Sequence, residues 1–230
     1  MSTDDGTARN AAARAAAQQI EPGMTIGLGS GRAVWRIIES ITERFGADPP
    51  LRAAFASSRT HDLARAAGIE TVRLDGRTRL DLALDGADEI DPGLGLLKGG
   101  GGALLREKIV IASAERFVVV AETRKRVDRL GSTFRLPVEV IRFGWPETRR
   151  RVLELVPAGA LRRREREEPY VTDEGHFLLD CHLPPDADLD ELGARLKATL
   201  GVVEHGLFLG MADQALLGCD DGRVEVLEAR

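Results

Sequence analysis

Short apolar runs alternate with helical patterns through the first half of the chain. Runs of the length of buried strands occur at 24–28, 53–56, 69–74, 80–84 and 117–121. After the first run, apolar residues repeat at helical spacing between Ala33 and Phe45, which predicts a helix with one buried face. Strands that alternate with helices predict an α/β fold, a Rossmann-like doubly wound parallel sheet.

The pattern changes beyond Asp128. A strand at 136–141 precedes a helix at 147–156, and Asp173-Glu174-Gly175 predicts a hairpin turn between 170–172 and 176–181. Another helix is expected at 189–200. We therefore expect a smaller inserted α+β (ferredoxin-like) domain. The expected boundaries are 1–130 and 207–230 for the α/β catalytic domain and 131–206 for the insertion.

Charge and composition exclude several classes of protein. The formal net charge is −5, from 32 basic and 37 acidic residues, which argues against a nucleic-acid or membrane-surface partner. The run Arg162 to Glu168 mixes both signs, and we interpret it as a solvated hairpin or loop. Only Cys181 and Cys219 are present, the first residues are polar, and no apolar run is long enough to span a membrane. A cytoplasmic protein is expected.

The stretch from Leu80 to Ala114 carries the densest candidate chemistry. An apolar run ends on the acids of D-G-A-D-E-I-D (85–91), and K-G-G-G-G-A (98–103) opens a helical pattern that contains R-E-K-I (106–109). Four consecutive glycines cost backbone entropy at each position, so something must approach the main chain closely there. Carboxylates at the carboxyl end of a strand, followed by a glycine-rich helix start, are typical of ligand sites in open α/β sheets.

These motifs resemble the signature of type A ribose-5-phosphate isomerases. The resemblance continues through F-V-V-V-A-E-T-R-K-R-V-D-R-L-G (117–131) and L-P-V-E-V-I (136–141) to G-L-F-L-G-M-A-D-Q-A-L-L-G (206–218), so it covers most of the chain in order. It implies an aldose-ketose isomerase that needs a carboxylate base, a donor for the enediolate oxygen and a remote phosphate grip.

The resemblance assigns a catalytic role to four residues. Glu107 is the implied base, Lys98 the cation that stabilises the enediolate oxygen, and Asp85 and Asp88 the groups that open the ring and bind hydroxyls. The residues alone also allow plainer roles: a helix-surface glutamate paired to a cation, a surface lysine, and aspartates that cap a helix or turn. Glu89 and Asp91 are interpreted as solvated or structural.

Binding of the substrate is implied for the glycine loop, Gly99, Gly100 and Gly101, and for a phosphate grip. The grip residues are Ser30, Gly31, Arg32, Ser57 and Lys125.

The phosphate loop departs from the family. The family usually has G-T-G-S-T, whereas this chain has G-S-G-R-A (29–33), which loses two hydroxyls and gains a guanidinium. The near-N-terminal lysine of the family is matched only by Arg9. Phosphate affinity and substrate preference could both change as a result.

Lysine usage supports two of these assignments independently. Only four of the 32 basic residues are lysines, and Lys98, Lys108 and Lys125 lie close together while Lys197 stands apart. An ammonium is a compact donor that a guanidinium does not replace. The clustering favours functional roles for Lys98 and Lys125.

The predicted function is interconversion of D-ribose 5-phosphate and D-ribulose 5-phosphate, in the non-oxidative branch of the pentose phosphate pathway. No cofactor and no metal are expected, since the four histidines lack ligand spacing; the partners are a small sugar phosphate and other copies of the chain in a homodimer or homotetramer. The alternatives are a non-catalytic sugar-phosphate-binding regulator, an isomerase for a different sugar phosphate, and another enzyme on a related fold, such as an acyl-CoA transferase or a sugar-phosphate deaminase. A metal-dependent aldose isomerase is the mechanistic rival.

Overall fold

The computed structural model describes residues 6–164 and 167–229, and the chain divides into two compact units. Unit 1 comprises Met1–Ala87, Arg106–Arg126 and Gly210–Arg230, and unit 2 comprises Asp88–Leu105 and Val127–Leu209. This division assigns 88–105 to the second unit, whereas the expected boundaries assign that segment to the first domain. The start of the chain, to residue 5, and residues 165 and 166 of the mixed-charge run lie outside the described residues.

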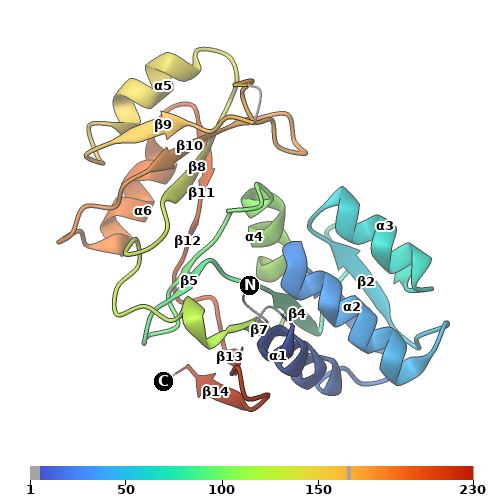
Figure 1. Cartoon of the computed structure of the whole chain (residues 1–230). Helices are drawn as coiled ribbons and strands as arrows, with labels where there is room; N and C mark the ends of the chain where they lie inside the picture. The colour runs from blue at the N-terminus through green and yellow to red at the C-terminus, as the bar shows by residue number, and fades with distance from the viewer. Residues whose placement is uncertain (1–5, 165–166, 230) are drawn as a thin grey trace. The chain divides into compact units, whose positions relative to one another are not determined.

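Unit 1 is built on a seven-stranded sheet with the order β14-β13-β7-β4-β1-β2-β3 (Figure 1). Its strands are β1 (Thr25–Leu28), β2 (Arg52–Phe55), β3 (Glu70–Thr71), β4 (Leu82–Asp85), β7 (Phe117–Glu122), β13 (Gln214–Gly218) and β14 (Val224–Glu228). All neighbours are parallel except β13 and β14, which form an antiparallel edge. The chain runs outward from β1 to β3 and then in the other direction from β4, which is the doubly wound Rossmann-like arrangement that the sequence predicts.

Helices cover both faces of this sheet. They are α1 (Thr7–Gln18), α2 (Gly31–Phe45), α3 (Ser58–Ala66) and α4 (Leu104–Ala112), the last beginning in unit 2, with a 3-10 turn η1 (Thr123–Lys125) after β7. The predicted apolar face of α2 is buried, and it shares one core with the alanine face of α1 and with β1. On the opposite face, a Cβ at Gly27 would lie 2.6 Å from Val110 Cγ1, so glycine there lets α4 pack directly on β1.

Unit 2 contains a four-stranded antiparallel sheet with the order β11-β8-β10-β9. Its elements follow one another as β8 (Leu136–Val140), α5 (Trp145–Val152), β9 (Gly159–Leu161), β10 (Phe177–Cys181), α6 (Leu189–Ala198) and β11 (Val202–His205). This β-α-β-β-α-β sequence is the ferredoxin-like unit. A small sheet of β12 (Leu207–Phe208), β6 (Leu96–Leu97) and β5 (Glu89–Ile90) completes unit 2.

Several elements differ from the sequence-based expectation. The strand expected at 69–74 is reduced to the two residues of β3, and the hairpin around Asp173-Glu174-Gly175 has its second strand in β10 but only an isolated bridge, Val171 to Phe177, on the other side. The helix expected at 147–156 begins earlier, at Trp145, where Pro146 occupies a first-turn position that needs no backbone donor. Among the described residues, no helix combines the length and the apolar character needed to cross a bilayer.

Candidate active site

The carboxyl ends of the parallel strands β1 and β4 lie side by side, at the point where the order of strand addition reverses. Gly29 follows β1, and a Cβ there would lie 1.9 Å from Asp85 Cγ at the end of β4, so only glycine fits. Asp85 is 1% exposed, and its Oδ1 accepts hydrogen bonds from the backbone N–H groups of Gly86 at 2.7 Å and Ser30 at 3.2 Å. Open α/β sheets bind ligands outside the carboxyl ends of the strands at this switch point.

Glu107 lies in the first turns of α4 and is 4% exposed, which rules out a helix-surface glutamate. The Ser30 hydroxyl donates to Glu107 Oε1 at 2.5 Å. Ser30 therefore joins two buried carboxylates, through its N–H to Asp85 and through its O–H to Glu107. A carboxylate that accepts such a bond is fixed in orientation, as a proton-abstracting base needs to be.

The residues expected to grip phosphate are distributed over the same edge of the sheet in unit 1. Gly31 begins α2 with a φ of 85°, and Arg32 is exposed in the first turn of that helix. Ser57 caps α3: its Oγ accepts from the Thr60 N–H at 3.1 Å and donates to Thr60 Oγ1 at 2.9 Å. Lys125 is half-buried in η1, directly after β7.

Ser57 also lines a small cavity in unit 1. The cavity has a volume of about 250 Å³ and is lined by Phe55, Ser57, Ser58, His61, Thr71, Val72 and Arg106. Ser57 thus caps α3 through its hydroxyl and also lines this cavity at the end of β2.

A partly buried ion pair at the end of β7 was not predicted from the sequence. Arg9 Nη2 lies 2.7 Å from Glu122 Oε1, and Arg124 Nη2 lies 3.4 Å from the same oxygen. Burial alone would raise the pKa of Glu122, but the ion pair and hydrogen bond with Arg9, helped by Arg124, lower it below its usual value. Arg9, which matches the family's N-terminal lysine position, is therefore held in place by a strand-end carboxylate.

In unit 2, Lys98 and Asp88 lie at the base of the glycine loop, Gly99 to Gly102. Lys98 is 3% exposed, and its ammonium lies 5.4 Å from the centre of the Phe208 ring, so it is no surface lysine. The backbone N–H of Lys98 donates to Gly206 O at 2.9 Å. Asp88 Oδ2 accepts from the Gly100 N–H at 2.8 Å, which ties this carboxylate to the loop.

Close approach of other groups explains why this loop consists of glycines. Gly99 and Gly102 have φ angles of 103° and 84°, and the Gly102 N–H donates to Gly99 O at 3.0 Å to close a turn. A Cβ at Gly100 would lie 2.8 Å from Asp88 Oδ1 and 2.9 Å from Phe134 Cζ. Gly99, Gly100 and Gly102 are therefore required by side chains of the same unit, as the entropy argument predicted for this loop.

The other two acids of the D-G-A-D-E-I-D motif are structural. Glu89 is fully buried and accepts hydrogen bonds from the backbone N–H groups of Gly131, Thr133 and Phe134. Asp91 Oδ1 accepts from the N–H groups of two glycines, each at 2.8 Å, in the turn that follows β5.

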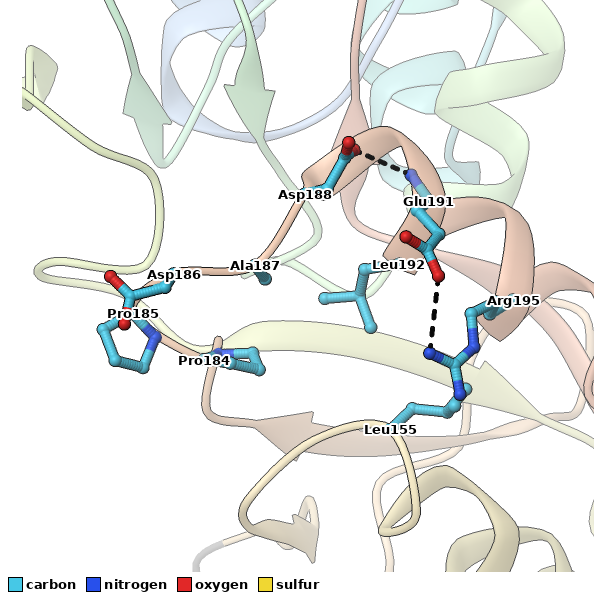
Figure 2. A pocket seen from close by; sticks show the side chains of 9 residues that line it. All are labelled: Leu155, Pro184, Pro185, Asp186, Ala187, Asp188, Glu191, Leu192 and Arg195. Carbon is cyan, nitrogen blue, oxygen red and sulfur yellow. Dashed lines mark hydrogen bonds and ion pairs between the residues drawn. The ribbon is translucent and has the colours of Figure 1, made fainter.

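A larger cavity in unit 2 gathers none of the predicted site residues (Figure 2). Its volume is about 360 Å³, and three of its four charged lining residues contact one another: Asp188 accepts from the Glu191 N–H at 3.0 Å, and Glu191 pairs with Arg195 at 3.6 Å. Within 6–164 and 167–229 no group of three or more His, Cys, Asp and Glu side chains is arranged to hold a metal ion.

Comparison with known proteins identifies relatives over nearly the whole chain. The family model for ribose 5-phosphate isomerase A (phosphoriboisomerase A) matches residues 53–222. The ribose-5-phosphate isomerase A of Roseiflexus sp. (strain RS-1) is 50% identical over 97% of this chain and 97% of its own, and that of Synechococcus sp. (strain JA-3-3Ab) is 46% identical over 93% and 94%. The solved ribose 5-phosphate isomerase from Plasmodium falciparum superposes with a TM-score of 0.90 at 33% identity, covering 96% of this chain and 97% of that one.

Proposed function

Since the chain belongs to the ribose 5-phosphate isomerase A family, we propose that it interconverts D-ribose 5-phosphate and D-ribulose 5-phosphate. The reaction moves one proton between C2 and C1 of the open-chain sugar and one between the neighbouring oxygens. A base removes the C2 proton, the electron pair forms the enediolate, and return of the proton to C1 gives the ketose. No other atoms are exchanged, so no oxidant or reductant is needed.

The observation that carries this proposal is the buried Glu107 carboxylate, held by the Ser30 hydroxyl at 2.5 Å at the switch point of the sheet. Glu107 takes the C2 proton and delivers it to C1. Asp85, fixed by backbone amides, binds a sugar hydroxyl and assists ring opening. A carboxylate whose geometry is set before the substrate arrives needs no reorganisation when the proton moves.

Lys98 and Asp88 have complementary roles in the proposal. The Lys98 ammonium stabilises the negative oxygen of the enediolate, and the low exposure of this side chain strengthens such an interaction because water screens it less. Asp88 binds a hydroxyl of the sugar while its other contact, to the Gly100 N–H, keeps the carboxylate against the glycine loop. The amides of Gly99, Gly100 and Gly101 bind the substrate in the same region.

A solved relative supports the substrate class. A D-ribose-5-phosphate isomerase with a TM-score of 0.88 and 34% identity to this chain was solved in complex with phospho-erythronic acid. That molecule combines a carboxylate with a phosphate, so it presents anionic oxygens at one end, as an enediolate does, and a phosphate at the other. A site for such a compound suits an enediolate intermediate of a sugar phosphate.

The phosphate is gripped in the proposal by Ser30, Gly31, Arg32, Ser57 and Lys125. The amides at the start of α2 favour an anion, and Arg32 supplies a bidentate charge in place of the lost hydroxyls. Ser30 then has two tasks, because its hydroxyl also contacts Glu107. The loss of two other hydroxyls and the gain of the Arg32 guanidinium are the reason why the altered loop could change the preference among sugar phosphates.

The test is a turnover panel with purified protein. Ribose 5-phosphate, other pentose phosphates and hexose phosphates are supplied one at a time, with and without prior EDTA treatment. We expect ribose 5-phosphate to be the best substrate and chelation to leave its turnover unchanged. Binding without turnover would favour the regulator, faster turnover of another sugar phosphate would redefine the substrate, and activity lost to EDTA and restored by a divalent ion would replace the mechanism.

We further propose that the enzyme works in the cytoplasm as a homodimer or homotetramer. Cys181 and Cys219 are both free and buried, which fits a reducing compartment. Sedimentation equilibrium of the purified protein measures the number of subunits.

A further inference from the structure

The glycine loop of unit 2 is held by side chains from a segment more than sixty residues away in the chain. Arg162 follows β9, and its Nη1 donates to Gly99 O at 2.9 Å and to Gly100 O at 3.1 Å. The Tyr170 hydroxyl donates to Gly101 O at 3.0 Å. Three consecutive carbonyl groups of the loop are therefore bound by two side chains.

Arg162 is itself fixed by the four-stranded sheet. Its Nε donates to Asp180 Oδ2 at 2.9 Å, and its Nη2 donates to Asp180 Oδ1 at 2.5 Å, on the neighbouring strand β10. The Arg162 side chain is 13% exposed, so the interpretation of 162–168 as a solvated segment is wrong for this residue. A bidentate pair of this kind leaves the guanidinium few alternative orientations.

Tyr170 is the only tyrosine of the chain and packs directly on the loop. A Cβ at Gly102 would lie 2.3 Å from the Tyr170 Oη, so the phenol occupies the space that a side chain at residue 102 would need. The Tyr170 hydroxyl is protonated and able to donate at neutral pH, and burial raises its pKa further.

The direction of the bound carbonyls fixes the direction of the amides. In a planar trans peptide the C=O and the following N–H point in opposite directions. Binding of the Gly99 and Gly100 carbonyls by Arg162 therefore turns the N–H groups of Gly100 and Gly101 to the other side of the loop. The Gly100 N–H is the one that holds Asp88, and Gly101 is exposed at the tip of the turn.

We propose that Arg162 and Tyr170 are positioning residues for the isomerisation. They act through the glycine loop, whose amides and Asp88 they hold in the geometry that the reacting end of the sugar requires. This inference rests on the proposed function. A contact that fixes donors in advance raises turnover more than affinity when those donors bind the developing negative charge best in the transition state.

The experiment compares single variants in steady-state turnover of ribose 5-phosphate and in thermal unfolding. Arg162→Ala should lower kcat by at least about tenfold with a smaller change in KM. The reason is that a small displacement of the loop amides from the reacting atoms has a large effect on the rate. Tyr170→Phe keeps the ring and removes one donor, and we expect a kcat about threefold to tenfold lower. Arg163→Ala is the matched control, since Arg163 contacts Glu167 and should leave kcat unchanged.

Chemical rescue separates positioning from stability. Millimolar guanidinium should restore part of the kcat of Arg162→Ala by occupying the vacated space, and should do nothing for Arg163→Ala. A residue with only a structural role would show a lower unfolding temperature without rescue. If Arg162→Ala does not fold, the kcat of Tyr170→Phe alone tests the positioning role.

The outcomes distinguish the two proposals. Wild-type protein that does not isomerise ribose 5-phosphate would overturn the proposed function and this inference together. Wild-type turnover combined with unchanged kcat in folded Arg162→Ala or in Tyr170→Phe would overturn the positioning role alone. Reduced kcat in the two variants, with rescue of the first, would establish it.

Discussion

Two glycine loops serve the proposed reaction, and they are built in different ways. The loop after β1 is held by a neighbouring strand end: Asp85 accepts the Ser30 N–H, and Gly29 leaves room for that carboxylate. The glycine loop of unit 2 is held through its carbonyls by Arg162 and Tyr170. The first loop depends on the geometry of a parallel sheet, and the second depends on a segment that is distant in sequence.

The difference shows what each loop contributes. In the first, one hydroxyl reaches the proposed base directly, so changes there should act on the chemical step. In the second, side chains act on backbone groups, so changes there should act through the orientation of donors. Substitutions at each loop test whether the first loop acts on the chemical step and the second on the orientation of donors.

The largest effect is expected at Glu107, beside the first loop. Glu107→Gln keeps the shape and can still accept from Ser30, but an amide cannot take the C2 proton, and turnover should fall by at least ~10²-fold. Initial rates with ribose 5-phosphate measure this. Glu115→Gln, an exposed glutamate just beyond α4, is the control and should behave as wild type. A Glu107→Gln enzyme within a few-fold of wild type would remove Glu107 from the role of base.

Gly29→Ala should disrupt the first loop by overpacking. Its Cβ would overlap Asp85, with 1.9 Å to Cγ, so we expect a loss of about 2 kcal/mol or more in the free energy of unfolding, with lower activity. Gly6→Ala is the matched control: its φ is −106° and the nearest atom to the added Cβ, on Asn10, lies 3.6 Å away, so little stability should be lost. Denaturant titration of both variants gives the comparison, and equal losses would show that the contact with Asp85 does not matter.

Lys98→Arg tests the base of the second loop. The variant keeps the charge, but Lys98 is 3% exposed beside Phe208, and a planar guanidinium is larger and directs its donors differently. We expect kcat/KM to fall by about tenfold, near 1.4 kcal/mol. Lys197→Arg, on the exposed side of α6, should be tolerated. Near-normal kinetics of Lys98→Arg would mean that the clustering of lysines in the sequence arose by chance.

A smaller effect should appear in the pH dependence of stability of unit 1. Because Arg9 and Arg124 lower the pKa of Glu122, this carboxylate stabilises the folded state above its usual value of 4.5, and the contribution is lost as the pH falls through the lowered pKa. Glu122→Gln should therefore lower the free energy of unfolding by about 1 kcal/mol at pH 7 and by less at pH 3. Urea titrations at the two pH values test the sign, and a constant difference would contradict it.

Unit 2 supplies the opposite case in Glu139. Burial raises the pKa of this carboxyl, although hydrogen bonds from Thr172 and His176 oppose the shift. Such a group favours the folded state more as the pH falls from the raised pKa towards 4.5, which is the reverse of Glu122. The same titrations on Glu139→Gln serve as the internal comparison.

Local patterns explain why both loops could be predicted, whereas the side chains that hold the second loop could not. The strand, glycine turn and helix around Gly29, and the acids after β4, lie in continuous segments, and the rule that parallel strands end at one edge brings them together. Arg162 and Tyr170 left no such signal, because each lies more than sixty residues from the glycines it contacts. The strands β5, β6 and β12 are two residues long, too short for any periodicity to show.

The roles of single side chains were harder to predict than the elements that carry them. Ser30 was expected on the phosphate, yet its hydroxyl contacts Glu107, since the sequence cannot show which way a loop side chain turns. Glu89 and Asp91 were interpreted as solvated or structural, and their oxygens do accept hydrogen bonds from backbone amides. The family motif identified the region, and the hydrogen bonds separate its functional candidates from its structural members.

Hydrogen exchange at C2 tests the central claim most directly. Ribose 5-phosphate deuterated at C2 is incubated with the protein in ordinary water, and the label in both sugars is followed by NMR. If Glu107 moves the proton through an enediolate, wild-type protein should form ribulose 5-phosphate with part of the deuterium lost to solvent, and Glu107→Gln should neither form the ketose nor release label. Release of label by Glu107→Gln at the wild-type rate, or no ketose from wild-type protein, would contradict the account.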